Sequence, residues 1–116
     1  MKSKLVYVCS PYRGETEKHR KYAKELTRAV LEAGGVPVTP HLYIALVLDD
    51  EEPEERKLGL SAGHEPLKSC PFILIGGKFG ISEGMRGEIE LARKIGTQEV
   101  MLKDGKLVKA ERGGYL

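Results

Sequence analysis

The sequence has 116 residues, of which 41% are hydrophobic and 31% are charged, and its formal net charge is +2. These values predict one soluble globular domain spanning residues 1–116, and they exclude a disordered chain. No apolar run reaches the roughly 18 residues of a membrane span or the length of a signal-peptide core, so we expect a cytoplasmic protein. The 19 basic and 17 acidic residues are mixed along the chain, unlike the one-sided basic stripe of a protein that binds a nucleic acid polymer.

The first third of the chain predicts a strand, a helix and a second strand. Leu5–Cys9 (LVYVC) is the continuous apolar run of a central parallel strand, in which Cys9 is a small buried hydrophobe. Apolar residues recur every three or four positions over residues 16–33, which predicts a helix that the glycine pair 34–35 ends. The strand after it, 36–38, completes a unit that implies a parallel sheet.

The middle of the chain predicts further helical segments and a buried strand. Residues 41–48 (HLYIALVL) are apolar and fit either a short helix or an irregular buried segment. The charged residues 49–57 surround Pro53, which predicts an exposed loop and then a helix to about residue 68, with Pro53 in its first turn. Residues 72–75 (FILI) are typical of a buried strand.

The last third predicts a glycine-rich loop over residues 76–82, a helix over 83–95 and a strand over 99–102. Asp104 and Gly105 form a turn signal that predicts a closing hairpin or edge strand. Strands that alternate with helices predict an α/β fold: a three-layer α/β/α, flavodoxin- or Rossmann-like architecture with a mostly parallel sheet of four to five strands.

Two loops of this fold are candidates for a binding site, because ligands of such sheets bind beyond the carboxyl ends of the strands. The first loop covers residues 10–14. Its Arg13 has a planar fork that suits a phosphate or carboxylate, although a loop arginine is also commonly just exposed. Tyr7 lies on the preceding strand and either aims its hydroxyl at the same crevice or packs in the core. The second loop covers residues 76–82.

The helix that follows the second loop carries the segment GISEGMRGEIELA. Gly84, Gly87 and Glu88 share one face of it, so the two glycines leave an open hollow beside the carboxylate. A glycine inside a helix costs about 1 kcal/mol, which indicates that something needs the space, although close helix–sheet packing is the alternative explanation. Ser82 lies at the helix start, either as an N-cap or as part of an anion site.

The segments VYVCSPYRG, PHLY and GISEGMRGEIELA together resemble the nucleoside 2-deoxyribosyltransferase superfamily, and within it the small branch of bacteria and their phages, over about residues 4–96. The strongest element is the spacing Ser82-x-Gly84-x-x-x-Glu88. The resemblance implies that Glu88 is a catalytic nucleophile and that Tyr7 orients it. The implied substrate- and phosphate-binding residues are Ser10, Arg13, Gly14, His41, Ser82 and Gly84.

The resemblance implies an N-glycosidase or deoxyribosyltransferase that acts on a nucleoside or nucleoside monophosphate. Glu88 would attack C1′, the base would leave, and water or a second base would complete the reaction. An anionic carboxylate suits the oxocarbenium-like transition state. The resemblance also implies a homo-oligomer, and we expect neither a cofactor nor a metal. A non-catalytic nucleotide-binding module and a purely structural protein are the alternatives.

The sequence departs from the transferases at two positions. They carry an aspartate at the end of the third strand, which assists the departing base, whereas FILIGGKFG has none; they also have an aspartate where Ser82 stands. A substitute acid would come from His41, Asp49 or Asp50. A structural histidine and a solvated run of carboxylates over residues 49–52 are the alternative interpretations.

Overall fold

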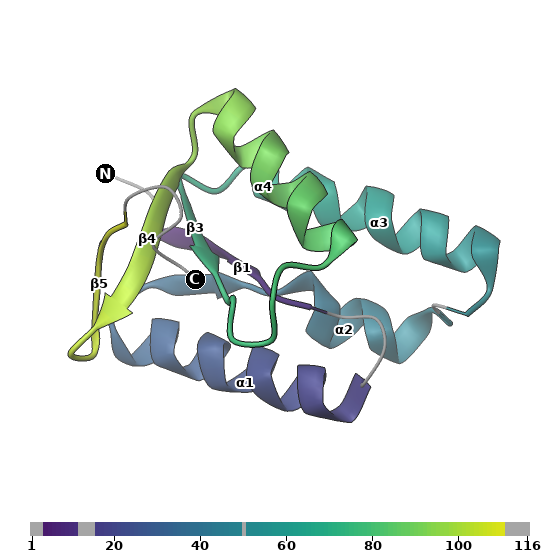
Figure 1. Ribbon diagram of the computed structural model, residues 1–116, viewed down its shortest axis with the longest axis horizontal. Helices are drawn as coiled ribbons and strands as arrows, with labels where there is room; N and C mark the ends of the chain where they lie inside the picture. Colours follow the sequence, from purple (N-terminus) through teal and green to yellow (C-terminus); the bar gives the residue numbers. More distant parts are fainter. Residues whose placement is uncertain (1–3, 12–15, 50, 111–116) are drawn as a thin grey trace.

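The computed structural model describes residues 4–11, 16–49 and 51–110, and Figure 1 shows their arrangement in three layers. The elements in chain order are β1 Leu5–Cys9, α1 Thr16–Glu32, β2 Val36–Val38, α2 Pro40–Val47, α3 Pro53–Lys68, β3 Phe72–Ile75, α4 Glu83–Ile95, β4 Gln98–Lys103 and β5 Lys106–Lys109. The sheet lies between α1 on one face and α3 with α4 on the other (Figure 1). The α/β architecture expected from the sequence is confirmed.

The five strands form one sheet in the order β2-β1-β3-β4-β5. The first four strands are parallel, and β5 pairs antiparallel with β4 through the predicted turn, where Asp104 and Gly105 both have positive φ. This is the flavodoxin-type strand order, in which the direction of winding reverses between β1 and β3. The carboxyl ends of these two strands therefore flank the crevice where such folds bind ligands.

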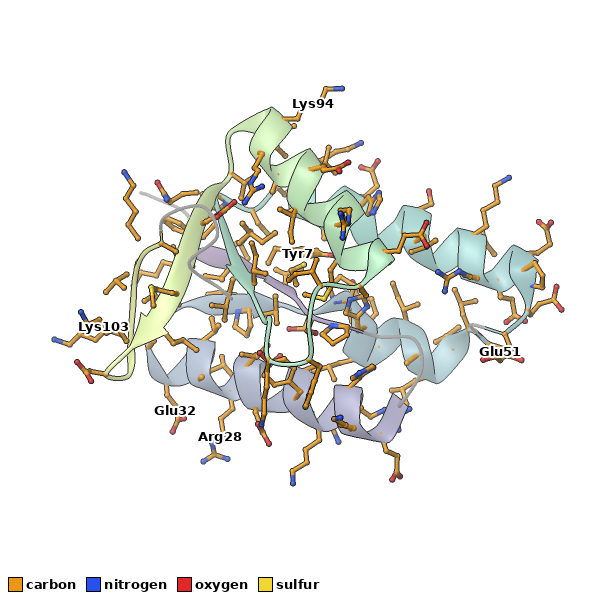
Figure 2. All side chains as sticks on the ribbon, in the orientation of Figure 1. Tyr7, Arg28, Glu32, Glu51, Lys94 and Lys103 are labelled. Carbon is orange, nitrogen blue, oxygen red and sulfur yellow. The ribbon has the colours of Figure 1, made fainter. Side chains whose placement is uncertain are left out.

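The alternation of side chains along β1 divides the core into two parts. Tyr7 and Cys9 point to the face covered by α3 and α4, and Val6 and Val8 point to the face covered by α1. Figure 2 shows Tyr7 in the interior of the molecule, whereas the labelled charged side chains lie at its periphery. A hydroxyl is thus placed in the α3–α4 half of the core, where it needs a hydrogen-bond partner.

The apolar segment after β2 is a helix, α2, and it settles the alternative that the sequence left open. Pro40 occupies its first turn, where its fixed φ suits a helix and its missing N–H is not needed. The segment is not buried throughout, because Leu46 and Val47 are 78% and 77% exposed. Among the helices in the described ranges, none has both the length and the apolar character required to cross a bilayer.

Gly76, at the start of the second loop, is fixed by close packing. A Cβ at this position would lie 2.5 Å from Leu26 Cδ1 and 2.9 Å from the Tyr22 hydroxyl, both on α1. A side chain at this position would require Leu26 and Tyr22 to shift. The glycine therefore sets the path of the loop that leads into α4.

Candidate functional site

Glu88 lies on α4, on the side of the helix that packs against the sheet. The helix begins at Ser82, whose Oγ accepts a hydrogen bond from the Met85 backbone N–H at 3.2 Å, so the N-cap interpretation is confirmed. Met85, Ile89 and Ala92 of this helix are buried in the core. Glu88 directly precedes Ile89 on this buried side, which leaves the carboxylate-bearing residue only 4% exposed.

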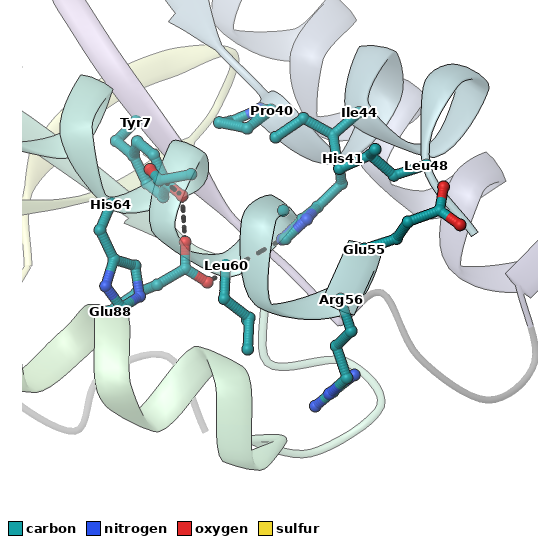
Figure 3. Close-up of a pocket in the computed structure, with 12 residues that line it drawn as sticks. Tyr7, Pro40, His41, Ile44, Leu48, Glu55, Arg56, Leu60, His64 and Glu88 are labelled. Atoms are coloured by element: carbon teal, nitrogen blue, oxygen red, sulfur yellow. Dashed lines mark hydrogen bonds and ion pairs between the residues drawn. The ribbon is translucent and has the colours of Figure 1, made fainter. Parts of the chain in front are cut away.

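Three side chains contact the two oxygens of the Glu88 carboxylate. The Tyr7 hydroxyl has two acceptors within reach of its one hydrogen, Oε2 of Glu88 and the Gly63 carbonyl at 3.1 Å. The Cys9 thiol lies 3.9 Å from Oε1, and Nε2 of His41 lies 3.9 Å from the same oxygen. Figure 3 shows the contacts with Tyr7 and His41 as dashed lines. Residues from β1, α2 and α4 thus meet at one buried acid.

Burial controls the protonation of this cluster. It raises the pKa of Glu88 to about 7, although hydrogen bonds from Tyr7 and Cys9 lower that pKa in part. Burial, together with the charge of Glu88, raises the pKa of the Tyr7 hydroxyl and of the Cys9 thiol. Near neutral pH the carboxyl is therefore poised between its two forms, while Tyr7 and Cys9 keep their protons. A carboxyl poised in this way is typical of catalytic sites.

The cluster opens into a pocket between α2 and α3. Glu88 and Tyr7 lie at its inner end, and Figure 3 shows the labelled side chains around it. The residues that line it are Tyr7, Pro40, His41, Ile44, Leu48, Glu55, Arg56, Gly59, Leu60, Gly63, His64 and Glu88. Its cavity volume is about 40 Å³, which admits water but not a sugar ring. A molecule as large as a sugar would therefore contact Glu88 through this pocket only if α2 and α3 moved apart.

The pocket brings together three of the residues predicted from the sequence: Glu88, Tyr7 and His41. Ser10, Ser82 and Gly84 do not line it. The Ser10 hydroxyl is buried beyond the end of β1 and has no hydrogen-bond partner in the part of the chain that the structure describes. Arg13 and Gly14 lie outside the described residues.

Gly84 and Gly87, the two glycines of α4, do not line the pocket that Glu88 faces. A Cβ added at Gly84 or at Gly87 would meet no atom within 4 Å. By contrast, a Cβ at Gly59 would lie 3.3 Å from Ile44, and one at Gly63 would lie 3.7 Å from the Tyr7 hydroxyl. The two α3 glycines therefore serve close packing against α2 and Tyr7, while those of α4 leave room.

Sequence reasoning assigned no site role to three polar residues of the pocket, Glu55, Arg56 and His64, all on α3. The available signal was the pair of glycines in α3, because His64 directly follows Gly63. The carboxylates proposed as substitute acids do not join the pocket: Asp49 accepts a hydrogen bond from the Glu51 backbone in an exposed turn, and Asp50 lies outside the described residues.

No group of three or more His, Cys, Asp or Glu side chains within the described ranges has a geometry that could hold a metal ion. The polar groups that face the pocket are instead proton carriers and hydrogen-bond donors. These are the groups that acid–base or nucleophilic chemistry on an organic substrate requires.

Residues 4–101 match the model of a domain of unknown function, DUF7768, and this range includes every pocket residue. No curated protein sequence matches the chain.

Proposed function

We propose that this chain, which belongs to that family of domains of unknown function, cleaves the base–sugar bond of a nucleoside or nucleoside monophosphate with Glu88 as the nucleophile. The observation that supports this most directly is the buried Glu88 carboxylate, whose two oxygens contact Tyr7 and His41 at the inner end of the pocket.

The environment of Glu88 suits a nucleophile that forms and then releases a sugar ester. Tyr7 and His41 approach different oxygens of the carboxylate, which fixes its orientation. Burial excludes water from the carboxylate. Its negative charge is therefore screened less and attracts a nearby cationic carbon more strongly. A pKa of about 7 leaves the ionised form available at neutral pH.

The proposed reaction is a double displacement. A Glu88 oxygen attacks C1′ as the base leaves, through an oxocarbenium-like transition state that the carboxylate stabilises. Water then releases the sugar, and a second base in place of water would make the reaction a transfer. The cavity of about 40 Å³ has room for the water. We also propose that a second copy of the chain lies beside the opening between α2 and α3 and completes the site.

The test uses a panel of deoxynucleosides and their 5′-monophosphates. Chromatography measures the free base that the protein releases from each of them. We expect wild-type turnover and its loss in Glu88→Gln, which keeps the size of the side chain. Glu90→Gln is the matched control, because Glu90 lies on the same helix and is exposed. Equal rates for Glu88→Gln and wild type would falsify the assignment.

A non-catalytic nucleotide-binding module is the second candidate, and one observation favours it. The strand β3 ends in Ile75 and continues into two glycines, so it provides no acid for the departing base. This candidate predicts a nucleotide that raises the melting temperature without any release of base. A specific ligand at 100 times its Kd would add about 2.7 kcal/mol of stability.

A further inference from the structure

The proposed function leaves one chemical requirement without a residue. When the bond between C1′ and the base breaks, the electron pair moves to a nitrogen of the base, and protonation of the base makes this departure easier. The strand β3 contributes no acid at its end. The proton carriers that line the pocket, apart from the nucleophile itself, are Tyr7, His41, Glu55 and His64.

Three of these four are occupied elsewhere. Burial holds the proton on Tyr7, whose hydroxyl has Glu88 and Gly63 as acceptors. His41 directs Nε2 toward Oε1 of Glu88, at 3.9 Å, and so acts on the nucleophile. Glu55 accepts a hydrogen bond from the Asp49 backbone N–H at 3.2 Å, near the start of α3.

His64 is placed differently. It directly follows Gly63, whose carbonyl accepts from Tyr7, and it lines the same pocket as Glu88. It is partly buried, and its side chain forms no hydrogen bond or ion pair with any other described residue. In Figure 3 the Glu88 carboxylate lies between the rings of His41 and His64. The imidazole of His64 is therefore available to a molecule that enters the pocket.

We propose, on the premise of the proposed function, that His64 is the acid that protonates the departing base and the base that later activates water. In the first step the bond from C1′ to the base breaks, its electron pair goes to the base nitrogen, and that nitrogen takes a proton from the His64 imidazolium. At the same time C1′ bonds to a Glu88 oxygen.

The second step restores both residues. A water oxygen bonds to C1′, the ester bond breaks with its electron pair returning to the Glu88 carboxylate, and the neutral His64 takes the water's proton. The sum is hydrolysis to free base and sugar, with no other reactant. An imidazole suits both steps because it can donate a proton in one form and accept a proton in the other.

The test compares two donors that need acid assistance to different degrees. One is the deoxynucleoside that wild type cleaves fastest, and the other is 4-nitrophenyl 2-deoxyriboside, whose leaving group departs as a stable anion. We expect His64→Gln to lower kcat/KM on the nucleoside by about 10²- to 10⁴-fold. On the nitrophenyl donor kcat/KM should fall by less than about tenfold, because kcat/KM reports the first step and that donor needs no protonation in it. His19→Gln is the matched control, since His19 packs on Phe79 away from the pocket.

The outcomes separate the two claims. Equal losses on both donors, or no loss on either, would overturn the role of His64 while the proposed function stands. Failure of wild type to cleave either donor would overturn both. Should His64→Gln misfold, His64→Ala with added imidazole replaces it, and we expect imidazole to restore nucleoside cleavage; a folded His64→Ala that imidazole does not rescue counts against the role. His41→Gln should lower cleavage of both donors alike.

Discussion

Tyr7 and Glu88, 81 positions apart in the sequence, share a hydrogen bond in the core, and the same hydroxyl also reaches the Gly63 carbonyl at 3.1 Å. A phenol has one hydrogen, so the two acceptors compete for it. When Glu88 is ionised, the charged carboxylate is the stronger acceptor. When Glu88 is protonated, its own O–H can donate to Tyr7, whose hydrogen then turns to Gly63. The protonation of Glu88 is thereby coupled to α3.

Tyr7→Phe should move the pH dependence of base release to higher pH. The hydrogen bond from Tyr7 lowers the pKa of Glu88, which lies at about 7, so its loss raises that pKa. Because the nucleophile must be ionised, the acid limb of the kcat/KM profile follows this pKa, and the midpoint of that limb should rise with it. The measurement is kcat/KM from pH 5 to 9. An unchanged midpoint would show that the hydroxyl does not act on the carboxylate.

Glu88→Gln should change how stability depends on pH. The folded pKa, about 7, lies above the ordinary value of 4.5, so the folded state binds this proton more tightly than the unfolded state does. The stability linked to the proton is complete below pH 4.5 and is lost as pH rises through 7, a change on the order of 3 kcal/mol. Wild type should therefore weaken relative to Glu88→Gln between pH 5 and 8.

Urea unfolding at several pH values measures this difference. Glu90→Gln serves as the control, because Glu90 is exposed on the same helix, and its difference from wild type should stay flat over the same range. A flat difference for Glu88→Gln as well would mean that Glu88 is solvated in the folded protein.

The sequence predicted those parts of the fold that local patterns determine. β1 and β3 are uninterrupted apolar runs, α4 has a serine cap and a buried stripe, and the Asp104–Gly105 turn demands positive φ. Each of these signals acts within a few residues. The boundaries of these elements therefore agree with the sequence to within a residue or two.

The pocket could be predicted only in part, because it depends on how α3 is rotated about its axis. The segment PEERKLGLSAGHEPLK has no continuous apolar stripe that would show which side faces the sheet. Its glycines look like weaknesses in a helix, yet they allow close packing against Ile44 and Tyr7. His64 follows one of these glycines, so its position in the pocket emerges only when α3 is placed against β1. Tyr7 and Glu88 were found through their local segments.

Two glycine substitutions should have opposite effects on stability. Gly76→Ala places a Cβ 2.5 Å from Leu26 and 2.9 Å from Tyr22, and such overpacking costs about 1–3 kcal/mol. Gly87→Ala adds a Cβ inside α4 where no atom lies within 4 Å, so it should stabilise by about 0.5–1 kcal/mol. Thermal and urea unfolding measure both. Stabilisation by Gly76→Ala would contradict the close approach of the loop to α1.

Ser82→Ala should lower the stability of the fold. Under the proposed function it should also lower the preference for a nucleoside monophosphate over the nucleoside. The Ser82 Oγ accepts the capping hydrogen bond from Met85 at 3.2 Å, and loss of such a cap costs about 1 kcal/mol. Accepting that bond leaves the hydroxyl hydrogen able to donate to an anion at the helix N-terminus. A hydrogen bond to a charged group contributes about 1.5–3 kcal/mol, so the preference for a monophosphate over its nucleoside should fall roughly tenfold or more. Ser61→Ala, at an exposed position of α3, should leave the preference unchanged. If Ser82→Ala loses stability but keeps the full preference, the residue is a helix cap alone and the phosphate is held by other groups.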